Sequence, residues 1–333
     1  MKSFTKIIIF SSLLLMLSLM VIPCMAAEKI ISPKGYPTRP VEYIIRWGPG
    51  GGSDIMGRTI CKIAEKVSGV KLIPVNITGA SGINAITEVM NRPADGYTLN
   101  GIESDWLVSL ALKATRYTEE DIAYIVRVNH DMEMVAVKAG DPRFEDFQSL
   151  VKYAKDNQGK LSIGTSGTGS IDDAVLGVIE EAFGFTSKHI PFSSLGDRCA
   201  SVLGGHVDAI QEQPGDILGY VKERKLKPLI ILTKKRIDHP VYKDVPTAKE
   251  LGHELTMAIW RGIGAKKGTP EEILRFWEKV FLEAMQTPEF KKWEKKKLYD
   301  YRKGPIGSKE FTKVIYEDYK NIKAVFQRMG LVK

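Results

Sequence analysis

The fold is decided by one stretch, Tyr43-Ile44-Ile45-Arg46-Trp47-Gly48-Pro49-Gly50-Gly51-Gly52-Ser53-Asp54. It begins with β-branched and aromatic residues that favour a strand. It continues through glycines, which reach positive φ without steric penalty, to Ser53 and Asp54, either of which can cap a helix. The pattern predicts a strand, a glycine turn and a helix over about residues 55–67. Backbone N–H groups at such a helix start can hold an anion, so we interpret the turn as half of a ligand-binding cleft.

The same order of strand, glycine turn and helix recurs along the chain. A predicted strand at residues 71–76 leads to Gly79-Ala80-Ser81-Gly82 and a helix, and one at 161–163 leads to Gly164-Thr165-Ser166-Gly167-Thr168-Gly169-Ser170 and a helix. Strands that alternate with helices predict a mainly parallel sheet, with ligands bound beyond the carboxyl ends of the strands. The second glycine-rich loop predicts a second domain that faces the first. After residue 268, breaks near 286–288 and 304–305 predict three helices.

Residues 1–26 have the composition of an export signal. Lys2 and Lys6 precede an apolar run at 7–22, and small residues follow it, which predicts a cleavable signal peptide and a periplasmic location. An uncleaved membrane anchor is the alternative, because the run is close to the ~18 residues that span a bilayer. Lipid attachment at Cys24 is a third reading. Cys61 and Cys199 are the remaining cysteines, and they form either a disulfide or two buried thiols.

Composition and motifs argue against several other functions. The chain of 333 residues carries a formal charge of +8, densest in the lysine-rich run at 291–297, which we interpret as a solvated helix face because no nucleic-acid motif accompanies it. The histidines and cysteines lack metal-ligand spacing. The glycine turns match neither a phosphate-binding loop, nor a dinucleotide fingerprint, nor a nucleophile elbow. We therefore expect no metal, no cofactor, no nucleic-acid partner and no catalysis.

Several motifs, in order, match one family. They are Tyr36-Pro37-Thr38-Arg39-Pro40-Val41, Gly48-Pro49-Gly50-Gly51-Gly52-Ser53-Asp54, Gly79-Ala80-Ser81-Gly82, Pro93-Ala94-Asp95-Gly96-Tyr97-Thr98-Leu99, Gly164-Thr165-Ser166-Gly167-Thr168-Gly169, Leu203-Gly204-Gly205-His206-Val207-Asp208, Asp244-Val245-Pro246-Thr247 and Lys267-Gly268-Thr269-Pro270. With these motifs the chain resembles the tripartite tricarboxylate transporter solute receptors, the TctC or Bug family of periplasmic binding proteins. The resemblance covers essentially all of the chain after the leader.

The resemblance implies an α/β fold of the type II periplasmic binding protein class, with two lobes joined by a two-strand hinge and a ligand cleft between them. Lobe one would comprise residues 28–130 plus 255–333, and lobe two residues 131–254. The implied function is a monomeric receptor that captures a small organic acid or amino-acid-like ligand and delivers it to the membrane permease of a tripartite tricarboxylate transporter. A receptor that feeds a signalling partner is the alternative, and the sequence does not separate the two.

The resemblance also implies the ligand-binding residues. In this family the first two loops of lobe one and the glycine loop of lobe two hold a carboxylate. The corresponding residues are Pro49, Gly50, Gly51, Ser53, Asp54, Ala80, Ser81, Gly82, Thr165, Ser166, Gly167 and Thr168.

Departures from the family pattern bear on the ligand. Glu103, Ser104 and Asp105 follow the third predicted strand where many relatives have only small residues, and Glu212-Gln213 replaces an Asp-Asn pair. Phe192 begins a turn that lacks the usual lysine, and with Trp47 it is a candidate apolar wall. Added carboxylates disfavour a highly anionic ligand such as citrate. We expect a mono- or dicarboxylate, or a ligand that also carries an amine bound by Glu103, Asp105 or Glu212.

Overall fold

The computed structural model describes residues 30–255, 259–328, 330 and 332. The chain divides into two units, Met1–Ile31 and Ser32–Lys333, and all elements below belong to the second. The predicted signal peptide and the possible lipid site at Cys24 lie outside the described residues. Among the described helices, none is long and apolar enough to cross a membrane. Cys61 and Cys199 are both buried free thiols, which decides between the two alternatives.

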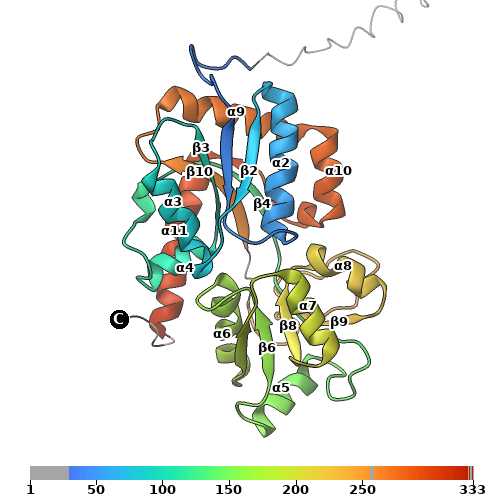
Figure 1. Ribbon diagram of the computed structural model, residues 1–333. Helices are drawn as coiled ribbons and strands as arrows, with labels where there is room; N and C mark the ends of the chain where they lie inside the picture. Colours follow the sequence, from blue (N-terminus) through green and yellow to red (C-terminus); the bar gives the residue numbers. More distant parts are fainter. Residues whose placement is uncertain (1–29, 256–258, 329, 331, 333) are drawn as a thin grey trace, which may run out of the picture. The chain divides into compact units, whose positions relative to one another are not determined.

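A six-stranded sheet is built from both ends of the second unit (Figure 1). Its strand order is β11-β4-β10-β3-β1-β2. The strands are β1 (Val41–Ile45), β2 (Leu72–Asn76), β3 (Thr98–Glu103), β4 (Ile122–His130), β10 (Trp260–Lys266) and β11 (Ile306–Gly307). β1 pairs in parallel with β2 and β3, whereas β10 runs antiparallel to β3 and β4.

Helices cover the six-stranded sheet. The helices α2, α9 and α10 pack on one another, and α4 packs on α11 at the other side of the sheet (Figure 1). Their bounds are α2 (Gly52–Ser68), α3 (Ile83–Asn91), α4 (Asp105–Ala111), α9 (Glu271–Gln286), α10 (Pro288–Lys296) and α11 (Ser308–Arg328), with 3-10 turns η1 (Ala80–Gly82), η2 (Glu119–Asp121) and η3 (Tyr299–Tyr301). The three predicted C-terminal helices are confirmed, although α9 begins one residue after Pro270.

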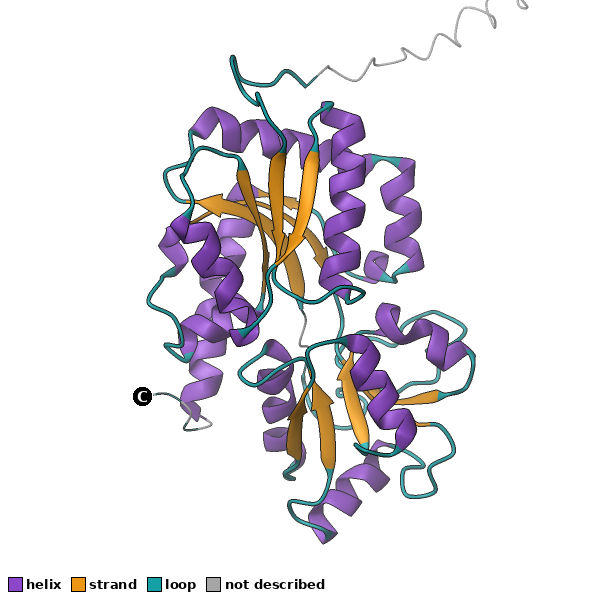
Figure 2. Ribbon diagram, viewed as in Figure 1, coloured by secondary structure: helices purple, strands orange, loops and turns teal. Residues whose placement is uncertain are grey.

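The middle of the chain forms a five-stranded sheet in the order β7-β6-β8-β5-β9 (Figure 2). The strands are β5 (Met134–Lys138), β6 (Ser162–Thr165), β7 (Lys188–Pro191), β8 (Ala209–Glu212) and β9 (Leu226–Ile231), and the helices are α5 (Phe147–Asp156), α6 (Ile171–Phe183), α7 (Leu195–Gly204) and α8 (Pro214–Lys222). Side chains of β5 alternate between its two faces, as a strand requires. Val135 and Val137 join one buried cluster, with α5 and α6, and Met134 and Ala136 join another, with α7 and α8.

One sequence-based prediction of secondary structure is wrong, and two elements were missed. The sheets are mixed rather than mainly parallel, because β10 returns antiparallel in the first sheet and β5 runs antiparallel to both of its neighbours in the second. Strand β4 and helix α8 were not predicted. β4 ends at His130 and β5 begins at Met134 without an intervening glycine or proline, so the two apolar runs read as one segment.

The organising turn differs from its prediction in one detail. Helix α2 starts at Gly52, and its N-cap is Gly51, with no capping hydrogen bond from a side chain. Ser53 and Asp54 therefore lie inside the first turn and cap nothing. Asp54 instead accepts hydrogen bonds from Gly50 N at 3.0 Å and from Arg58 Nε at 2.8 Å. The φ of Gly50 is 85°, a conformation that glycine adopts without strain.

Candidate functional site

A small cavity of about 60 Å³ lies where the turn before α2 meets residues of the five-stranded sheet. Residues at the ends of strands from both sheets line it, together with residues of the loops that follow those strands. The residues are Trp47, Gly48, Gly51, Gly52, Ser53, Glu103, Asp105, Ser166, Ile171, Asp172, Phe192, Ser193, Ser194, Leu195, Arg198, Glu212, Gln213, Asp216, Ile259 and Arg261. We call this cavity the cleft.

The N-terminus of α2 forms one wall of the cleft. Gly51, Gly52 and Ser53 line it, and no side chain caps this helix of 17 residues. The first N–H groups of an α-helix have no partner within the helix, and the helix dipole adds partial positive charge there. Two side chains approach this helix start closely, because a Cβ at Gly52 would lie 2.6 Å from Arg261 Nη2 and still closer to Asp216 Oδ2. This end of the cleft is therefore suited to a negatively charged group.

Arg261 connects the two sheets at the floor of the cleft. It lies at the start of β10, is 4% exposed, and donates from Nη1 to Asp131 Oδ2 and from Nη2 to Gln213 Oε1, both at 3.2 Å. Its Nε donates to Ser53 Oγ at 3.2 Å. A buried charge is stable only when it is paired and hydrogen-bonded, and Arg261 meets both conditions. It thereby links the start of α2 to the segments around β5 and β8.

Two carboxylates at the end of β3 face the cleft. Trp47 Nε1 donates to Glu103 Oε2 at 2.8 Å, and Ile171 N donates to Asp105 Oδ1 at 2.8 Å. Within the described residues, the second oxygen of each carboxylate has no hydrogen-bond donor. Burial, reinforced by the nearby charge of Glu103, raises the pKa of Asp105 to about 7. The two acceptors are therefore available to a donor that enters the cleft.

Arg198 on α7 holds two further carboxylates. Its Nη1 donates to Asp172 Oδ2 at 2.8 Å, and its Nη2 pairs with Glu212. Burial raises the pKa of Glu212 to about 7, although the charge of Arg198 acts in the opposite direction. The Nε of Arg198 is buried and has no partner in the described part of the chain. Such an unmet donor is unusual in a folded interior and suits a polar group of a ligand.

A fifth carboxylate, Asp216 on α8, pairs with Lys297, the residue directly after α10. Lys297 Nζ donates to Asp216 Oδ1 at 2.8 Å, and the Lys297 side chain is only 14% exposed. The interpretation of residues 291–297 as a solvated face is therefore wrong for Lys297. Among the described residues, the cleft is thus lined by five carboxylates and only two guanidinium groups. Because both guanidinium groups already pair with carboxylates, the cleft has an excess of negative charge.

The structure brings part of the predicted site together. Of the predicted residues, Trp47, Gly51, Ser53, Glu103, Ser166, Phe192, Glu212 and Gln213 line the cleft. The remaining ones do not line it; they are Pro49, Gly50, Asp54, Ala80, Ser81, Gly82, Ser104, Thr165, Gly167 and Thr168.

The residues that do not line the cleft have other positions. Ser81 Oγ donates to Thr168 O at 2.7 Å, so these two predicted loops contact each other directly. Gly50 and Asp54 bond to each other within the turn. Ser104 faces a second, larger cavity.

The sequence prediction omitted four charged residues of the cleft. They are Asp172, Arg198, Asp216 and Arg261. Each contacts an opposite charge at least 26 positions away in the sequence, and Arg198 also contacts Glu212, which is 14 positions away. Charges that pair at such distances leave no local pattern. The turn after Phe192 lacks the lysine usual in the family, so we expected one cation fewer in the cleft. Arg198 and Arg261 supply two cations that this expectation did not include. Arg46, which precedes the glycine turn, donates to the backbone carbonyls of Ser81 and Gly82. A group of acidic, histidine or cysteine side chains that could hold a metal ion is absent from the described residues.

Known proteins with similar sequences cover most of the chain. A protein of Cupriavidus necator, described as the UPF0065 protein in the gbd 5' region, is 28% identical over 299 residues, which are 90% of each chain. The protein BugT of Bordetella pertussis is 27% identical over 262 residues, or 77% of this chain and 79% of BugT.

Similar solved structures are also solute-binding or periplasmic transport proteins. A TctC solute binding protein from Polaromonas is 28% identical and superimposes with a TM-score of 0.66, covering 88% of this chain and 99% of that one. Another, described as a periplasmic transporter, is 26% identical with a TM-score of 0.81, covering 89% and 99%. The two α/β sheets are those of the periplasmic binding protein fold. The sequence model of the tripartite tricarboxylate transporter family receptors, TctC, matches residues 57–331, and the chain belongs to this family of solute-binding proteins.

Proposed function

We propose that the protein is a periplasmic receptor for a small ligand that carries both a carboxylate and an amine, which it delivers to a tripartite tricarboxylate-type permease. The observation that carries the ligand class is the lining of the cleft, where five carboxylates outnumber two guanidinium groups beside an uncapped helix start. A purely anionic ligand would leave the excess carboxylates without a partner, and a purely cationic one would leave the helix start without a partner. A zwitterion satisfies both the carboxylates and the helix start.

The carboxylate end of the ligand is assigned to α2 and Arg261. The N–H groups of Gly52 and Ser53 lie at the positive end of the helix dipole, and Arg261 donates to Ser53 on the same wall. Two structural neighbours from Rhodopseudomonas palustris support an acid as ligand. One is described as MatC with bound malate and another as a protein with adipate, at 22% and 20% identity with TM-scores of 0.79 and 0.80.

The amine end of the ligand is assigned to Glu103 and Asp105. Each has one oxygen without a donor among the described residues, and an ammonium group supplies three donors. Trp47 and Phe192 also line the cleft and provide apolar contact for the carbon skeleton. A charge-assisted hydrogen bond in a buried site is stronger than one between neutral groups. Glu103 and Asp105 therefore select for an amine.

Ligand entry requires the cleft to open. Its volume of about 60 Å³ is far below the ~300–1,000 Å³ of typical small-molecule sites. The connections at 131–133 and 259, which join strands of different sheets, are the proposed hinge, and the proposed lobes are residues 28–130 plus 255–333 and residues 131–254. A ligand that contacts both lobes favours the closed form through its differential affinity. The permease would then recognise that form.

Calorimetric titration and thermal unfolding test the ligand class. The panel pairs acids of similar size with and without an amine, for example glutamate with glutarate and aspartate with succinate, and adds citrate. A ligand at about a hundred times its Kd adds ~2.7 kcal/mol to the free energy of unfolding. We expect amine-bearing acids to bind most tightly. Tighter binding of citrate or of the amine-free partners would refute the assignment.

A charge-neutralising variant tests the role of Glu103. Glu103→Gln keeps an acceptor oxygen for Trp47 Nε1 and removes one negative charge, so it should weaken an amine-bearing acid about tenfold or more, ~1.4 kcal/mol per factor of ten. Its effect on the amine-free acid should be small. Glu271→Gln, at an exposed position on α9, is the matched control and should change neither affinity. Delivery to a permease is tested separately, by ligand uptake in cells with and without the receptor gene.

A further inference from the structure

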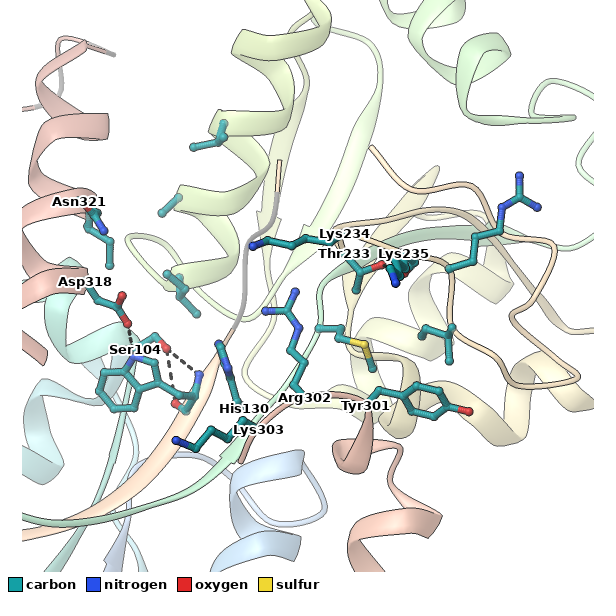
Figure 3. A pocket seen from close by; sticks show the side chains of 18 of the residues that line it. Ser104, His130, Thr233, Lys234, Lys235, Tyr301, Arg302, Lys303, Asp318 and Asn321 are labelled. Carbon is teal, nitrogen blue, oxygen red and sulfur yellow. Dashed lines mark hydrogen bonds between the residues drawn. The ribbon is translucent and has the colours of Figure 1, made fainter. Parts of the chain in front are cut away.

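A second cavity of about 790 Å³ lies next to the hinge connections (Figure 3). Its volume falls within the range of ligand-binding pockets, whereas the cleft is much smaller. The lining residues are Ser104, His130, Met132, Ile171, Ala174, Val178, Thr233, Lys234, Lys235, Arg236, Ile237, Asp238, Trp260, Tyr301, Arg302, Lys303, Asp318, Asn321, Ile322 and Phe326. We call this space the rear cavity.

The rear cavity and the cleft lie on opposite faces of the same strands. In an extended chain, successive side chains point to opposite sides. Ile259 and Arg261 line the cleft, while Trp260 between them lines the rear cavity. Ser104, the helical N-cap residue of α4, also lines the rear cavity, whereas its neighbours Glu103 and Asp105 line the cleft. The two cavities therefore lie on different faces of β10, and they adjoin at Ile171, which lines both.

One wall of the rear cavity is apolar. Ala174 and Val178 of α6 and Ile322 and Phe326 of α11 line it, and each is at most 9% exposed. Met132 adds a further apolar side chain. Hydrocarbon placed against this wall would gain about 25 cal/mol for each Å² of apolar surface removed from water. The wall therefore suits a ligand with an apolar body.

The other side of the rear cavity is strongly basic. Lys234, Lys235 and Arg236 follow β9, and Arg302 and Lys303 precede β11, against Asp238 and Asp318 among the described lining residues. Lys234 and Arg302 point into the same space from these two segments (Figure 3).

The acidic partners of these groups lie mainly outside the cavity. Arg236 pairs with Glu250 and Lys303 with Glu310, neither of which lines it. Asp318 accepts a hydrogen bond from Trp260 Nε1 at 3.0 Å. Within the described residues, Lys234 and Lys235 have no acidic partner.

His130 also reflects the positive field. Burial, together with the charges of Arg127 and Arg302, lowers the pKa of His130 to about 3. The ring therefore stays neutral at physiological pH, because protonation would add another cation beside those already present. An anion in the rear cavity would offset the charges that disfavour the protonated ring.

We propose that the rear cavity is a second binding site, for an organic acid with one carboxylate on an apolar body. The carboxylate would bind at the exposed Lys234, in the space that Arg302 also enters (Figure 3), with the charge of Lys235 nearby, and the apolar body would lie against α6 and α11. The cleft is a poorer fit for such a ligand, because its volume is small and its carboxylates Glu103 and Asp105 would face an acid that has no amine. This site is independent of the function proposed for the cleft.

Binding of octanoate to the full chain tests the proposal. Isothermal titration compares octanoate with octylammonium, which has the same chain and the opposite charge, and with uncharged octan-1-ol. We expect octanoate to bind with one site and the other two at least about tenfold more weakly, a difference of ~1.4 kcal/mol or more. Equal binding of the three probes would overturn the proposed carboxylate contact.

Variants locate the octanoate. The double variant Lys234→Gln with Lys235→Gln should weaken it about tenfold or more, and Asn321→Trp, an exposed α11 position on the cavity lining, should block it by filling space. Lys152→Gln, an exposed lysine on α5 away from both cavities, should change nothing. All three variants should retain binding of the cleft ligand. If Glu103→Gln alters octanoate binding and the lysine variant does not, octanoate occupies the cleft and the rear site is refuted.

Discussion

Replacement of Arg198 by methionine should destabilise the protein in a manner that depends on pH. The guanidinium group pairs with Asp172 and Glu212, and the side chains of all three residues are at most 7% exposed. Removing one partner of a buried ion pair leaves uncompensated buried charge and costs about 3–5 kcal/mol. Methionine retains most of the apolar stem, so the lost charge dominates the effect.

The pH dependence follows from Glu212. Its folded pKa of about 7 lies above the ordinary value of 4.5. The contribution of Glu212 to the free energy of unfolding is therefore fully present below pH 4.5 and is lost as the pH rises through 7. Arg198 holds this pKa down, and without Arg198 the pKa of Glu212 rises further. Each rise of the pKa by one unit corresponds to about 1.36 kcal/mol of free energy. The variant should therefore lose about 3–5 kcal/mol at pH 8 and clearly less at pH 5, where the carboxyl is protonated in both proteins.

Urea unfolding followed by circular dichroism at pH 5 and pH 8 measures the difference. Arg236→Met is the matched control, because its pair with Glu250 is 44% exposed on both sides and should contribute less than ~1 kcal/mol. An equal loss for Arg198→Met at both pH values would show that packing, not buried charge, governs the effect. A loss no greater than that of the control would contradict the whole account.

Three further predictions concern the cleft. Gly52→Ala should weaken the cleft ligand at least several-fold by titration calorimetry while α2 remains folded, because the new methyl group displaces Asp216 and Arg261. Unchanged affinity would show that the ligand depends on neither side chain. Ser81→Ala removes a hydrogen bond to Thr168 O, so it should increase hydrogen exchange at residues 164–169 without ligand, by about fivefold for ~1 kcal/mol. An amine-bearing ligand should bind more tightly at pH 8 than at pH 6, because the ionised form of Asp105, whose pKa is about 7, holds the amine; a flat profile of Kd against pH would count against this role.

The glycine turns made an α/β class predictable because they have a local cause, whereas the two-lobed periplasmic binding protein fold was implied by the family resemblance. A strand that ends in Gly48–Gly52 and continues as α2 needs no information from elsewhere in the chain, and the order of such units restricts the topology. Strand direction is different. β10 carries an apolar run like that of any buried strand, and only the return of the chain from the second sheet makes it antiparallel.

The cleft was predictable in outline and not in its charges. Glu103 and Glu212 were named because they depart from the family pattern, and both are the last residues of their strands, β3 and β8, where sheet geometry places ligands. Arg261 lies at a strand end as well, but its partner Asp131 is 130 positions away. Spacing along the chain does not encode such a pair. The close approach of α8 to Lys297 has the same origin, since only the packed fold brings these segments together.

The two cavities explain how the hinge tolerates so much buried charge. Asp131 and Glu133 are each fully buried beside the cleft, where five carboxylates already face one another. Burial lowers the pKa of Arg302 in the rear cavity, and the charges of Asp131 and Glu133 act in the opposite direction. The cations of one face thus stabilise the anions of the other through a single layer of backbone. Because attraction in a low-dielectric interior extends over such distances, the excess carboxylates of the cleft and the cations of the rear cavity stabilise each other.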